Sequence, residues 1–358
     1  MDRKTSILDE SAIYSKIDQT GFGERIFGLP DQCGIAWEKG LSVNIPNNFK
    51  KVENVVVSGV GGSAIGGELL SDLSHLIGGV PVTVCRDYEL PRFVGRKSLV
   101  IVSSYSGNTG ETISAFNYAK EYGAKILALT AGGQLENIAI SHGVPVVKID
   151  YVGEPRTALG YSFITPLAIL RNLNLLEHSS DLVYEAIETM RLLSMKLMPA
   201  VPTVDNPAKE LATLIKDKLI IIYGGGILSG VARRWKTQFN ENAKSWAVLE
   251  LFPEAGHNAI AGIKWPKSIS KNTCGVILNT WSLRPRLKTR YRVIKELLIE
   301  TGSDCRVVDG IGYGALSQML SIVVFGDFVS YYLAILNGEN PAPVPPLDHL
   351  KNLLEGLH

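Results

Sequence analysis

Short apolar runs alternate with amphipathic stretches in the first half of the chain. Five of these runs are rich in β-branched residues and bounded by Gly, Pro or Asn, at residues 54–58, 80–85, 98–104, 125–130 and 144–149. Continuous apolar runs of this length are typical of strands that are buried on both faces. Helices are predicted between them, at residues 64–76, 111–122 and 134–141. This alternation predicts a parallel sheet covered by helices.

The pattern is interrupted in the middle of the chain and then starts again. Residues 164–198 are expected to be helical, and the three prolines within residues 199–207 indicate a linker, because proline cannot continue a helix. After this break we predict strands at 218–223, 246–251, 275–279 and 305–308, helices at 227–242 and 287–301, and a long apolar helix at 315–336.

The two halves begin in the same way. Each starts with an apolar strand that runs into a Gly-rich turn and a helix, at residues 57–64 and 222–229. This repeat predicts two similar α/β domains that face each other across a cleft. The expected division is an N-terminal helical segment at 1–50, a first domain at 51–200, a second domain at 201–340, and a C-terminal tail with a helix at 341–358.

Composition narrows the class of protein. The 358 residues are 46% hydrophobic and 20% charged, which is a globular composition. Lys and Arg number 36 against 35 Asp and Glu, so the chain has no bulk attraction for nucleic acid or anionic membranes. The scattered cysteines and histidines argue against a disulfide scaffold and a zinc site. The N-terminus has no apolar signal core, and the apolar stretch 316–336 contains Asp327, so we expect a cytoplasmic protein with a buried helix there.

Two turns between a strand and a helix are suited to an anion, because free N–H groups and the helix dipole favour negative charge there. The first turn contains Gly62 and Ser63, and the turn after the third strand contains Ser104, Ser106 and Thr109. Hydroxyl and N–H groups can donate to phosphate without adding a full positive charge. Such residues also serve as ordinary turns and caps. The cluster of hydroxyls on neighbouring strands nevertheless favours phosphate binding.

Four segments together resemble a known family: GVGGSAIGG at 59–67, SYSGNTGET at 104–112, EPRTALG at 154–160 and NEN at 240–242. The second is similar to the phosphosugar-binding signature of the sugar isomerase (SIS) domain. Over about residues 20–355 the chain resembles the bifunctional phosphoglucose/phosphomannose isomerases. The resemblance implies two SIS domains, each a mainly parallel sheet flanked by helices, and a homodimer. It also implies aldose–ketose isomerisation of hexose 6-phosphates without a metal or redox cofactor.

This reaction requires a group that opens the sugar ring, a base that moves a proton between C2 and C1, and a cation that stabilises the enediolate. Glu241 is the candidate base, because it lies near the end of a helix, whose dipole favours protonation of a carboxylate. His257 lies in a loop after a strand and is expected to open the ring. In the family the matching histidine comes from the neighbouring subunit. Arg156 is expected to stabilise the enediolate.

Each of these residues also has a purely structural interpretation. Glu241 could be a solvated surface residue, His257 a structural loop histidine, and Arg156 one half of an ion pair with Glu154 or another acid. Arg233 and Arg234, beside the second Gly-rich turn, are interpreted as part of a solvated helix face.

Two positions weaken the transfer of family roles to this chain. Related sequences can carry a lysine before the Leu-Gly-Asp of the late helix, whereas this chain has Val324 and no such cation. Ser317 falls near the position where a small hydroxyl residue is thought to make room for both C2 epimers.

Two other functions compete with the isomerase. A non-catalytic phosphosugar-binding regulator would need the hydroxyl loop but not the three catalytic candidates together, and no DNA-binding segment stands out. A nicotinamide-dependent oxidoreductase could use the first turn, which matches G-x-G-x-x-A, with Asp87 on the ribose. A glutamine-dependent aminosugar synthase would need an amidotransferase domain, for which the short segment after Met1 is expected to leave no room.

Overall fold

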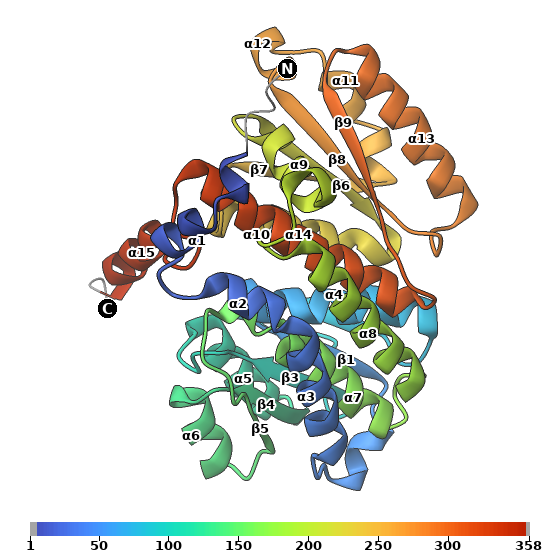
Figure 1. Cartoon of the computed structure of the whole chain (residues 1–358). Coiled ribbons are helices and arrows are strands. Elements are labelled where there is room, and N and C mark those ends of the chain that lie inside the picture. Colours follow the sequence, from blue (N-terminus) through green and yellow to red (C-terminus); the bar gives the residue numbers. More distant parts are fainter. Residues whose placement is uncertain (1–5, 356–358) are drawn as a thin grey trace.

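Two parallel sheets with helices between and around them form the molecule (Figure 1). The computed structural model describes residues 6–355. The N-terminal sheet has the strand order β2-β1-β3-β4-β5, and the C-terminal sheet has the order β7-β6-β8-β9. Every pairing between these strands is parallel. The predicted fold class, α/β with two mainly parallel sheets flanked by helices, is confirmed.

The N-terminal sheet is buried on both faces. Its elements are β1 (Asn54–Ser58), α4 (Gly61–Ile77), β2 (Val82–Cys85), β3 (Ser98–Ser103), α5 (Gly110–Glu121), β4 (Lys125–Thr130), α6 (Gly133–Ser141) and β5 (Val146–Lys148). Val55 and Val57 of β1 face the large core, whereas Val56 faces a second core on the opposite side of the sheet. Consecutive residues of this strand therefore lie in apolar cores on opposite faces of the sheet, which explains why the apolar runs are continuous.

Further helices come from the segments on either side of this sheet in the sequence. They are α1 (Ser11–Ile17), α2 (Phe22–Phe27), α3 (Leu29–Ser42), a π-helical turn (Gly160–Ile164), α7 (Thr165–Asn172) and α8 (Ser180–Leu197). The prediction of helix throughout residues 164–198 is wrong, because residues 173–179 separate α7 from α8. Asn174 adopts a left-handed φ of 56° there, a conformation that few residue types other than Gly, Asn and Asp visit readily.

The second half contains all four predicted strands, with ends shifted by one or two residues. Its elements are α9 (Pro207–Ile215), β6 (Leu219–Gly225), α10 (Ser229–Glu241), β7 (Ala247–Phe252), α11 (Ala259–Gly262), α12 (Lys267–Ser270), β8 (Thr273–Asn279), α13 (Pro285–Glu300), β9 (Asp304–Asp309) and α15 (Pro345–Glu355). The predicted linker ends at Pro207, the first residue of α9, where the missing N–H of proline needs no partner. The proposed domain boundaries remain a prediction.

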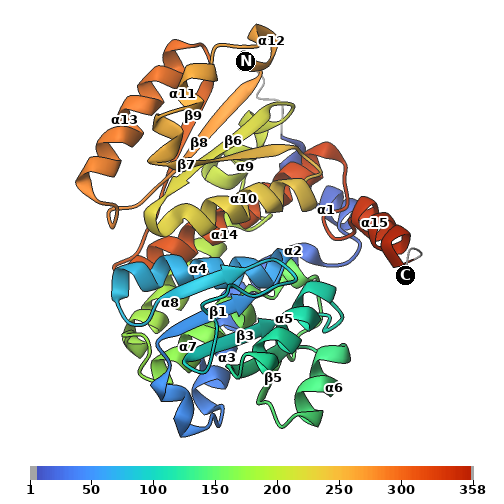
Figure 2. The same cartoon turned by 180° about the vertical axis from the view of Figure 1, so that it is seen from behind.

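The long apolar helix α14 (Ala315–Asn337) lies between the two sheets, against α8, α9 and α10 (Figures 1 and 2). Among the described residues, this one helix is long and apolar enough to cross a membrane. However, 89% of its most apolar stretch is buried inside the protein. The largest hydrophobic core contains residues of both sheets and of α14. The two halves therefore share one core, with α14 as its central element.

Helices α4 and α10 also join the two halves. The Asp72 carboxylate of α4 accepts a hydrogen bond of 2.6 Å from the Gly230 N–H in the first turn of α10. One turn earlier, Glu68 pairs with Arg233 of α10 at 2.8 Å and with Arg86 at 2.8 Å. Burial raises the pKa of Asp72 to about 7. The bond from Gly230 and the charge of Arg233 oppose this rise, while the charge of Glu68 adds to it.

We expect Asp72→Asn to stabilise the protein, and to do so more at pH 8 than at pH 5. The asparagine oxygen can still accept the Gly230 N–H, but the buried charge is gone. Because the pKa of Asp72 is raised from 3.8 to about 7 in the folded protein, its contribution to stability falls as the pH rises through this range. Asparagine does not ionise, so the variant does not lose stability in this way. The Tm of the variant should therefore exceed that of the wild type by more at higher pH.

The measurement is thermal unfolding of both proteins between pH 5 and pH 8. Asp87→Asn, at an exposed position, is the control and should change Tm little at any pH. A Tm difference for Asp72→Asn that stays constant over this range would contradict the prediction.

Candidate active site

The two predicted anion-binding turns meet at the carboxyl edge of the N-terminal sheet. β1 and β3 are neighbours, and β2 lies on the other side of β1. Connections from β1 and β3 therefore leave in opposite directions, and ligands of open α/β sheets bind at such a switch point. Gly62 and Ser63 lie in the first turn of α4, and Ser104, Ser106 and Thr109 lie between β3 and α5.

The hydroxyl groups of the second turn form a compact loop. Ser104 Oγ and Thr109 Oγ1 are 2.9 Å apart, and Ser104 Oγ also accepts the Gly107 N–H at 3.0 Å. Gly107 has a φ of 71°, and a Cβ there would lie 1.7 Å from the Gly132 carbonyl oxygen, so only glycine can occupy the position. Ser104 is buried, whereas Ser106 is exposed. The loop presents neutral donors beside the N-terminus of α5, which suits a phosphate group.

Gly62 brings the first turn of α4 against the segment that carries Arg156. A Cβ at Gly62 would lie 2.8 Å from the Pro155 carbonyl oxygen and 3.0 Å from Arg156 Cα. The hydroxyl loop reaches the same segment, because the Tyr105 hydroxyl donates to the Tyr151 carbonyl at 2.8 Å. Both predicted phosphate turns and Arg156 are thus held at one edge of the sheet.

The guanidinium of Arg156 is buried, with 6% of the residue exposed, and is held by several acceptors. Its Nε donates to Asn242 Oδ1 at 2.7 Å, and its Nη2 donates to the carbonyls of Pro341 and Ala342, each at 2.7 Å. Its Nη1 lies 3.5 Å from Glu241 Oε2, which is long for a strong hydrogen bond. Burial lowers the pKa of Arg156 and the charge of Glu241 raises it, and the guanidinium stays charged.

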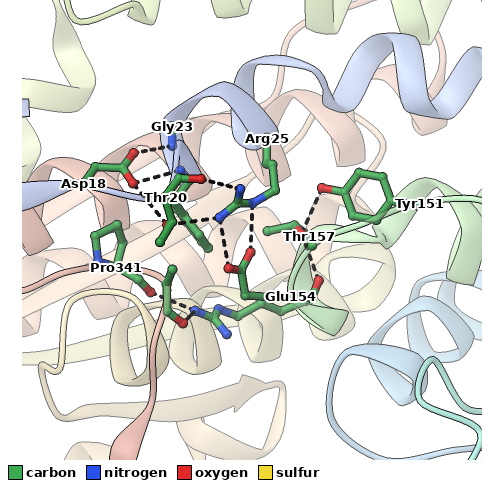
Figure 3. Close-up of polar contacts among 12 residues, drawn as sticks. Asp18, Thr20, Gly23, Arg25, Tyr151, Glu154, Thr157 and Pro341 are labelled. Atoms are coloured by element: carbon green, nitrogen blue, oxygen red, sulfur yellow. Dashed lines mark hydrogen bonds and ion pairs between the residues drawn. The ribbon is translucent and has the colours of Figure 1, made fainter. Parts of the chain in front are cut away.

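Glu154 has a different partner. Its carboxylate accepts two hydrogen bonds of 2.9 Å from Arg25, and its backbone carbonyl accepts one from Thr157 Oγ1 (Figure 3). The Tyr151 hydroxyl donates to the same Thr157 oxygen at 2.9 Å. Glu154 is therefore not the acid that pairs with Arg156, whereas the other alternative from the sequence, an ion pair with another acid, is met by Glu241. Arg156 pairs with Glu241, on the opposite side of the site.

Glu241 is the last residue of α10, as predicted, and its side chain is 26% exposed. The flanking asparagines hold this helix end. Asn240 Oδ1 accepts the Ala247 N–H at 3.0 Å, and Asn242 links Arg156 to Ser330, whose Oγ accepts its Nδ2 at 2.9 Å. The carboxylate therefore lies beside a fixed guanidinium and remains partly accessible, unlike a fully solvated surface glutamate.

Arg234 is buried, with only 2% exposed, so its interpretation as part of a solvated helix face is wrong. Its Nη2 donates to Asp327 Oδ2 at 2.7 Å, and its Nη1 donates to the Arg156 carbonyl at 3.1 Å. Asp327 also accepts a bond of 2.9 Å from Gln238. The Arg234–Asp327 pair thus supports the backbone of Arg156. An acid within the apolar stretch 316–336 is the sequence signal for this pair, because a buried carboxylate needs a partner.

A cation that the sequence analysis missed lies close to Glu241. Val324 is fully buried in α14, so no charge enters the site from that position. Lys244 follows the end of α10 instead, and its Nζ donates to the Asn340 carbonyl. Burial, together with the charge of Arg156, lowers the pKa of Lys244 to about 8, and nearby carboxylates including Glu241 oppose the shift.

Two candidate residues lie away from Glu241 within the same chain. His257 is exposed and follows β7 at the carboxyl edge of the C-terminal sheet. Glu241 is at the far end of α10, whose 13 residues span about 20 Å. Ser317 is buried in the first turn of α14, where its Oγ donates to the Gly314 carbonyl and accepts the Gly314 N–H. The roles given to His257 and Ser317 remain predictions.

Two further features concern a metal and a dinucleotide. Within residues 6–355, no group of three His, Cys, Asp or Glu side chains is placed to hold a metal ion. Asp87, the ribose acid of the oxidoreductase alternative, is exposed, and its Oδ1 accepts the Tyr88 N–H at 2.7 Å. What the geometry does offer is neutral phosphate donors next to a carboxylate–guanidinium pair.

Comparisons with known proteins agree with this chemistry. A family model described as the bacterial phospho-glucose isomerase C-terminal SIS domain matches residues 204–354. A bifunctional phosphoglucose/phosphomannose isomerase of Caldicellulosiruptor bescii is 41% identical over 332 residues, which cover 92% of this chain and 98% of that protein. A protein of the same name from Aquifex aeolicus is 32% identical, with 87% and 93% covered. A D-glucosamine-6-phosphate 4-epimerase of Sulfolobus acidocaldarius is 33% identical over 63% of this chain and 68% of that protein.

Solved structures share the fold at low sequence identity. A hypothetical protein from Thermus thermophilus has a TM-score of 0.75 at 16% identity, with 96% of this chain and 92% of that chain covered. The C-terminal domain of glucosamine-fructose-6-phosphate aminotransferase from Francisella tularensis has a TM-score of 0.65 at 16% identity, with 89% and 96% covered. These two likenesses support the fold alone. The nearly full-length similarity to the Caldicellulosiruptor and Aquifex proteins shows that the chain belongs to the bifunctional phosphoglucose/phosphomannose isomerase family.

Proposed function

We propose that this protein interconverts glucose 6-phosphate, and also mannose 6-phosphate, with fructose 6-phosphate through an enediolate. The observation that carries the proposal is the Glu241 carboxylate, 3.5 Å from the Arg156 guanidinium and at the same edge as the hydroxyl loop. The named relatives favour neither a non-catalytic regulator nor a nicotinamide-dependent oxidoreductase. A reducing, cytoplasmic location is proposed because the cysteines are buried and unpaired, at Cys33, Cys85, Cys274 and Cys305.

The phosphate end of the sugar is proposed to bind at the switch point of the N-terminal sheet. Ser63, Ser104, Ser106 and Thr109 supply hydroxyl donors, and the Gly62 region supplies backbone N–H groups at the start of α4. The dipoles of α4 and α5 both favour negative charge at this edge. Neutral donors bind the dianion without a buried counter-charge, which allows product to leave quickly.

The carbon end of the sugar is then placed beside Glu241 and Arg156. The carboxylate removes the proton from C2 of the open-chain aldose, and the C–H electrons form the C1=C2 bond while O1 gains the negative charge. Arg156 Nη1 stabilises that oxyanion. Glu241 returns the proton to C1, and the hydroxyl proton of O2 is transferred to O1, which leaves the ketone at C2. No electrons leave the substrate, so the step needs no redox cofactor.

Ring opening is assigned to His257 of a neighbouring subunit. Within one chain His257 and Glu241 lie at opposite edges of the C-terminal sheet, so a single chain does not bring them together. A homodimer that places the His257 loop of one subunit over the hydroxyl loop of the other would complete the site. Neutral imidazole can accept and return a proton near neutral pH, as ring opening requires.

Glu241→Gln is expected to lower kcat by about 10²–10⁴-fold, because the amide cannot accept the C2 proton. Binding of fructose 6-phosphate should be preserved, since the phosphate donors are unchanged. Turnover, calorimetric binding and deuterium incorporation from D₂O at C1 and C2 measure these effects. Glu210→Gln, at an exposed position of α9, is the control. Turnover close to that of the wild type in Glu241→Gln would remove Glu241 from the role of base.

Arg156→Lys is expected to lower kcat by about 10²–10³-fold. A lysine keeps the charge, but a single ammonium cannot reach Asn242, two backbone carbonyls and the oxyanion together. The inhibition constant of inorganic phosphate should change little, because phosphate reports on the hydroxyl loop. Arg96→Lys, at an exposed position, is the control. A parallel loss of phosphate affinity and turnover would show a general folding defect and contradict the assigned role.

Mixing two inactive variants tests the shared site. We expect Glu241→Gln and His257→Gln dimers to regain activity after their subunits are exchanged. Each mixed dimer then has one site with both wild-type residues and one site with neither. Random exchange makes about half of the dimers mixed, so about a quarter of wild-type activity should return. If both residues act within one chain, every site carries one lesion, and no activity returns.

A further inference from the structure

A cavity of about 600 Å³ lies at the carboxyl edge of the C-terminal sheet. Its walls include Ile227 and Ser229 after β6, Pro253 after β7, and Ser282 and Leu283 after β8. β6 and β8 are neighbours, and β7 lies on the other side of β6. The cavity therefore occupies the switch point of this sheet, the place where open α/β sheets bind their ligands. The proposed function places the substrate at the corresponding point of the N-terminal sheet. It uses the carboxyl edge of the C-terminal sheet only through the His257 loop after β7, which begins at the cavity wall.

Three arginines line this cavity, where the N-terminal sheet has serine and threonine. Arg284 precedes α13, and Arg286 and Arg290 lie in its first turns. The last two are four residues apart and so share one face of the helix. No ion pair among residues 6–355 involves any of the three. Permanent positive charges thus line this switch point, and none of them is held in an ion pair among the described residues.

One acid, Asp72, lines the same cavity. Its carboxylate accepts a hydrogen bond of 2.6 Å from the Gly230 N–H, one of the free N–H groups in the first turn of α10. Burial raises the pKa of Asp72 to about 7, so part of its population is uncharged near neutral pH. The three arginines therefore outweigh it, and the cavity has a net positive charge.

The remaining wall is largely apolar. Leu76, Ile227, Leu283 and Leu287 supply aliphatic surface. Ser282 Oγ is buried and has no hydrogen-bond partner among the described residues. A volume of about 600 Å³ falls within the range of about 300–1,000 Å³ that holds small organic ligands. The lining combines cations with an apolar wall, which suits a ligand that has both a multiply charged end and an apolar body.

We propose that this cavity is a second binding site, for an anionic ligand with two or more phosphate groups on an aromatic body, chemically a nucleoside diphosphate. The planar forks of the guanidinium groups match phosphate oxygens in bidentate geometry. The leucine and isoleucine side chains then cover the aromatic body.

Calorimetric titration of the full-length protein with ADP tests the proposal. Saturating fructose 6-phosphate is present to occupy the hydroxyl loop. We expect one ADP to bind per chain, pyrophosphate to bind more weakly, and adenosine to bind least. Arg286→Gln and Arg290→Gln should each weaken ADP binding by about tenfold or more, because each removes a charge-assisted hydrogen bond. Arg292→Gln, at an exposed position of α13 outside the cavity, is the matched control and should bind ADP like the wild type.

Asp72→Asn should shift the affinity in the opposite direction. It removes the one carboxylate that lines the cavity, so ADP should bind more tightly to this variant than to the wild type, with the larger gain at pH 8. His75, which also lines the cavity, and Glu68 and Arg233, whose charges act on Asp72, are the same in both proteins. A tighter variant cannot be explained by partial unfolding. Isomerase turnover of Arg286→Gln and Arg290→Gln is measured in parallel, so that failure of this proposal is distinguished from failure of the proposed function.

Three results would overturn the proposal. The first is absence of ADP binding when fructose 6-phosphate is bound. The second is equal ADP affinity in the wild type, Arg286→Gln and Arg290→Gln. The third is closure of the cavity by a second copy of the chain, seen as a change in the dimer dissociation constant of Arg290→Gln with no ADP bound.

Discussion

The buried guanidinium of Arg156 is the contact on which the arrangement of the site depends. Arg156 lies in a short 3₁₀ helix (Pro155–Thr157) at the edge of the N-terminal sheet. Its hydrogen-bond acceptors are Asn242 at the end of α10 and two backbone carbonyls in the segment after α14. Cζ of Arg156, the central carbon of the guanidinium, also lies 5.2 Å from the centre of the Phe22 ring. A desolvated cation is unfavourable unless its donors find acceptors. These fixed acceptors therefore leave the side chain one favourable position, beside Glu241.

A second buried ion pair, Arg234–Asp327, stabilises the backbone of Arg156. Arg234 and Asp327 are almost completely inaccessible, and Arg234 also donates to the Arg156 carbonyl. Removal of one member of such a pair leaves an uncompensated charge, which typically costs about 3–5 kcal/mol. Because α10 and α14 carry the two members, packing of these helices and orientation of Arg156 are coupled. The core shared by the two sheets thus contains buried polar groups, and these groups hold Arg156 in place at the site.

The two sheets have kept the same topology around their switch points but differ in the chemistry placed there. Hydroxyl groups and helix N-termini line the N-terminal switch point, whereas arginines and leucines line the C-terminal one. Helix α10 begins at the second of these places and ends at Glu241, near the first. One rigid element of 13 residues therefore connects the cavity with the proposed base.

The sequence by itself determined the parallel α/β character, the order of the strands along the chain, and the residues of the hydroxyl loop and of the helix end at Glu241. These features are local, because apolar periodicity, glycine turns and helix ends depend on residues that are close in the sequence. The break at residues 173–179 was missed because a single left-handed Asn174 leaves no clear periodic signal. Tertiary structure alone decided that Arg25 pairs with Glu154, that Arg234 is buried, and that three arginines line one cavity. Burial and ion pairing join segments that are far apart in the sequence, and no local pattern specifies which of many charged residues will meet.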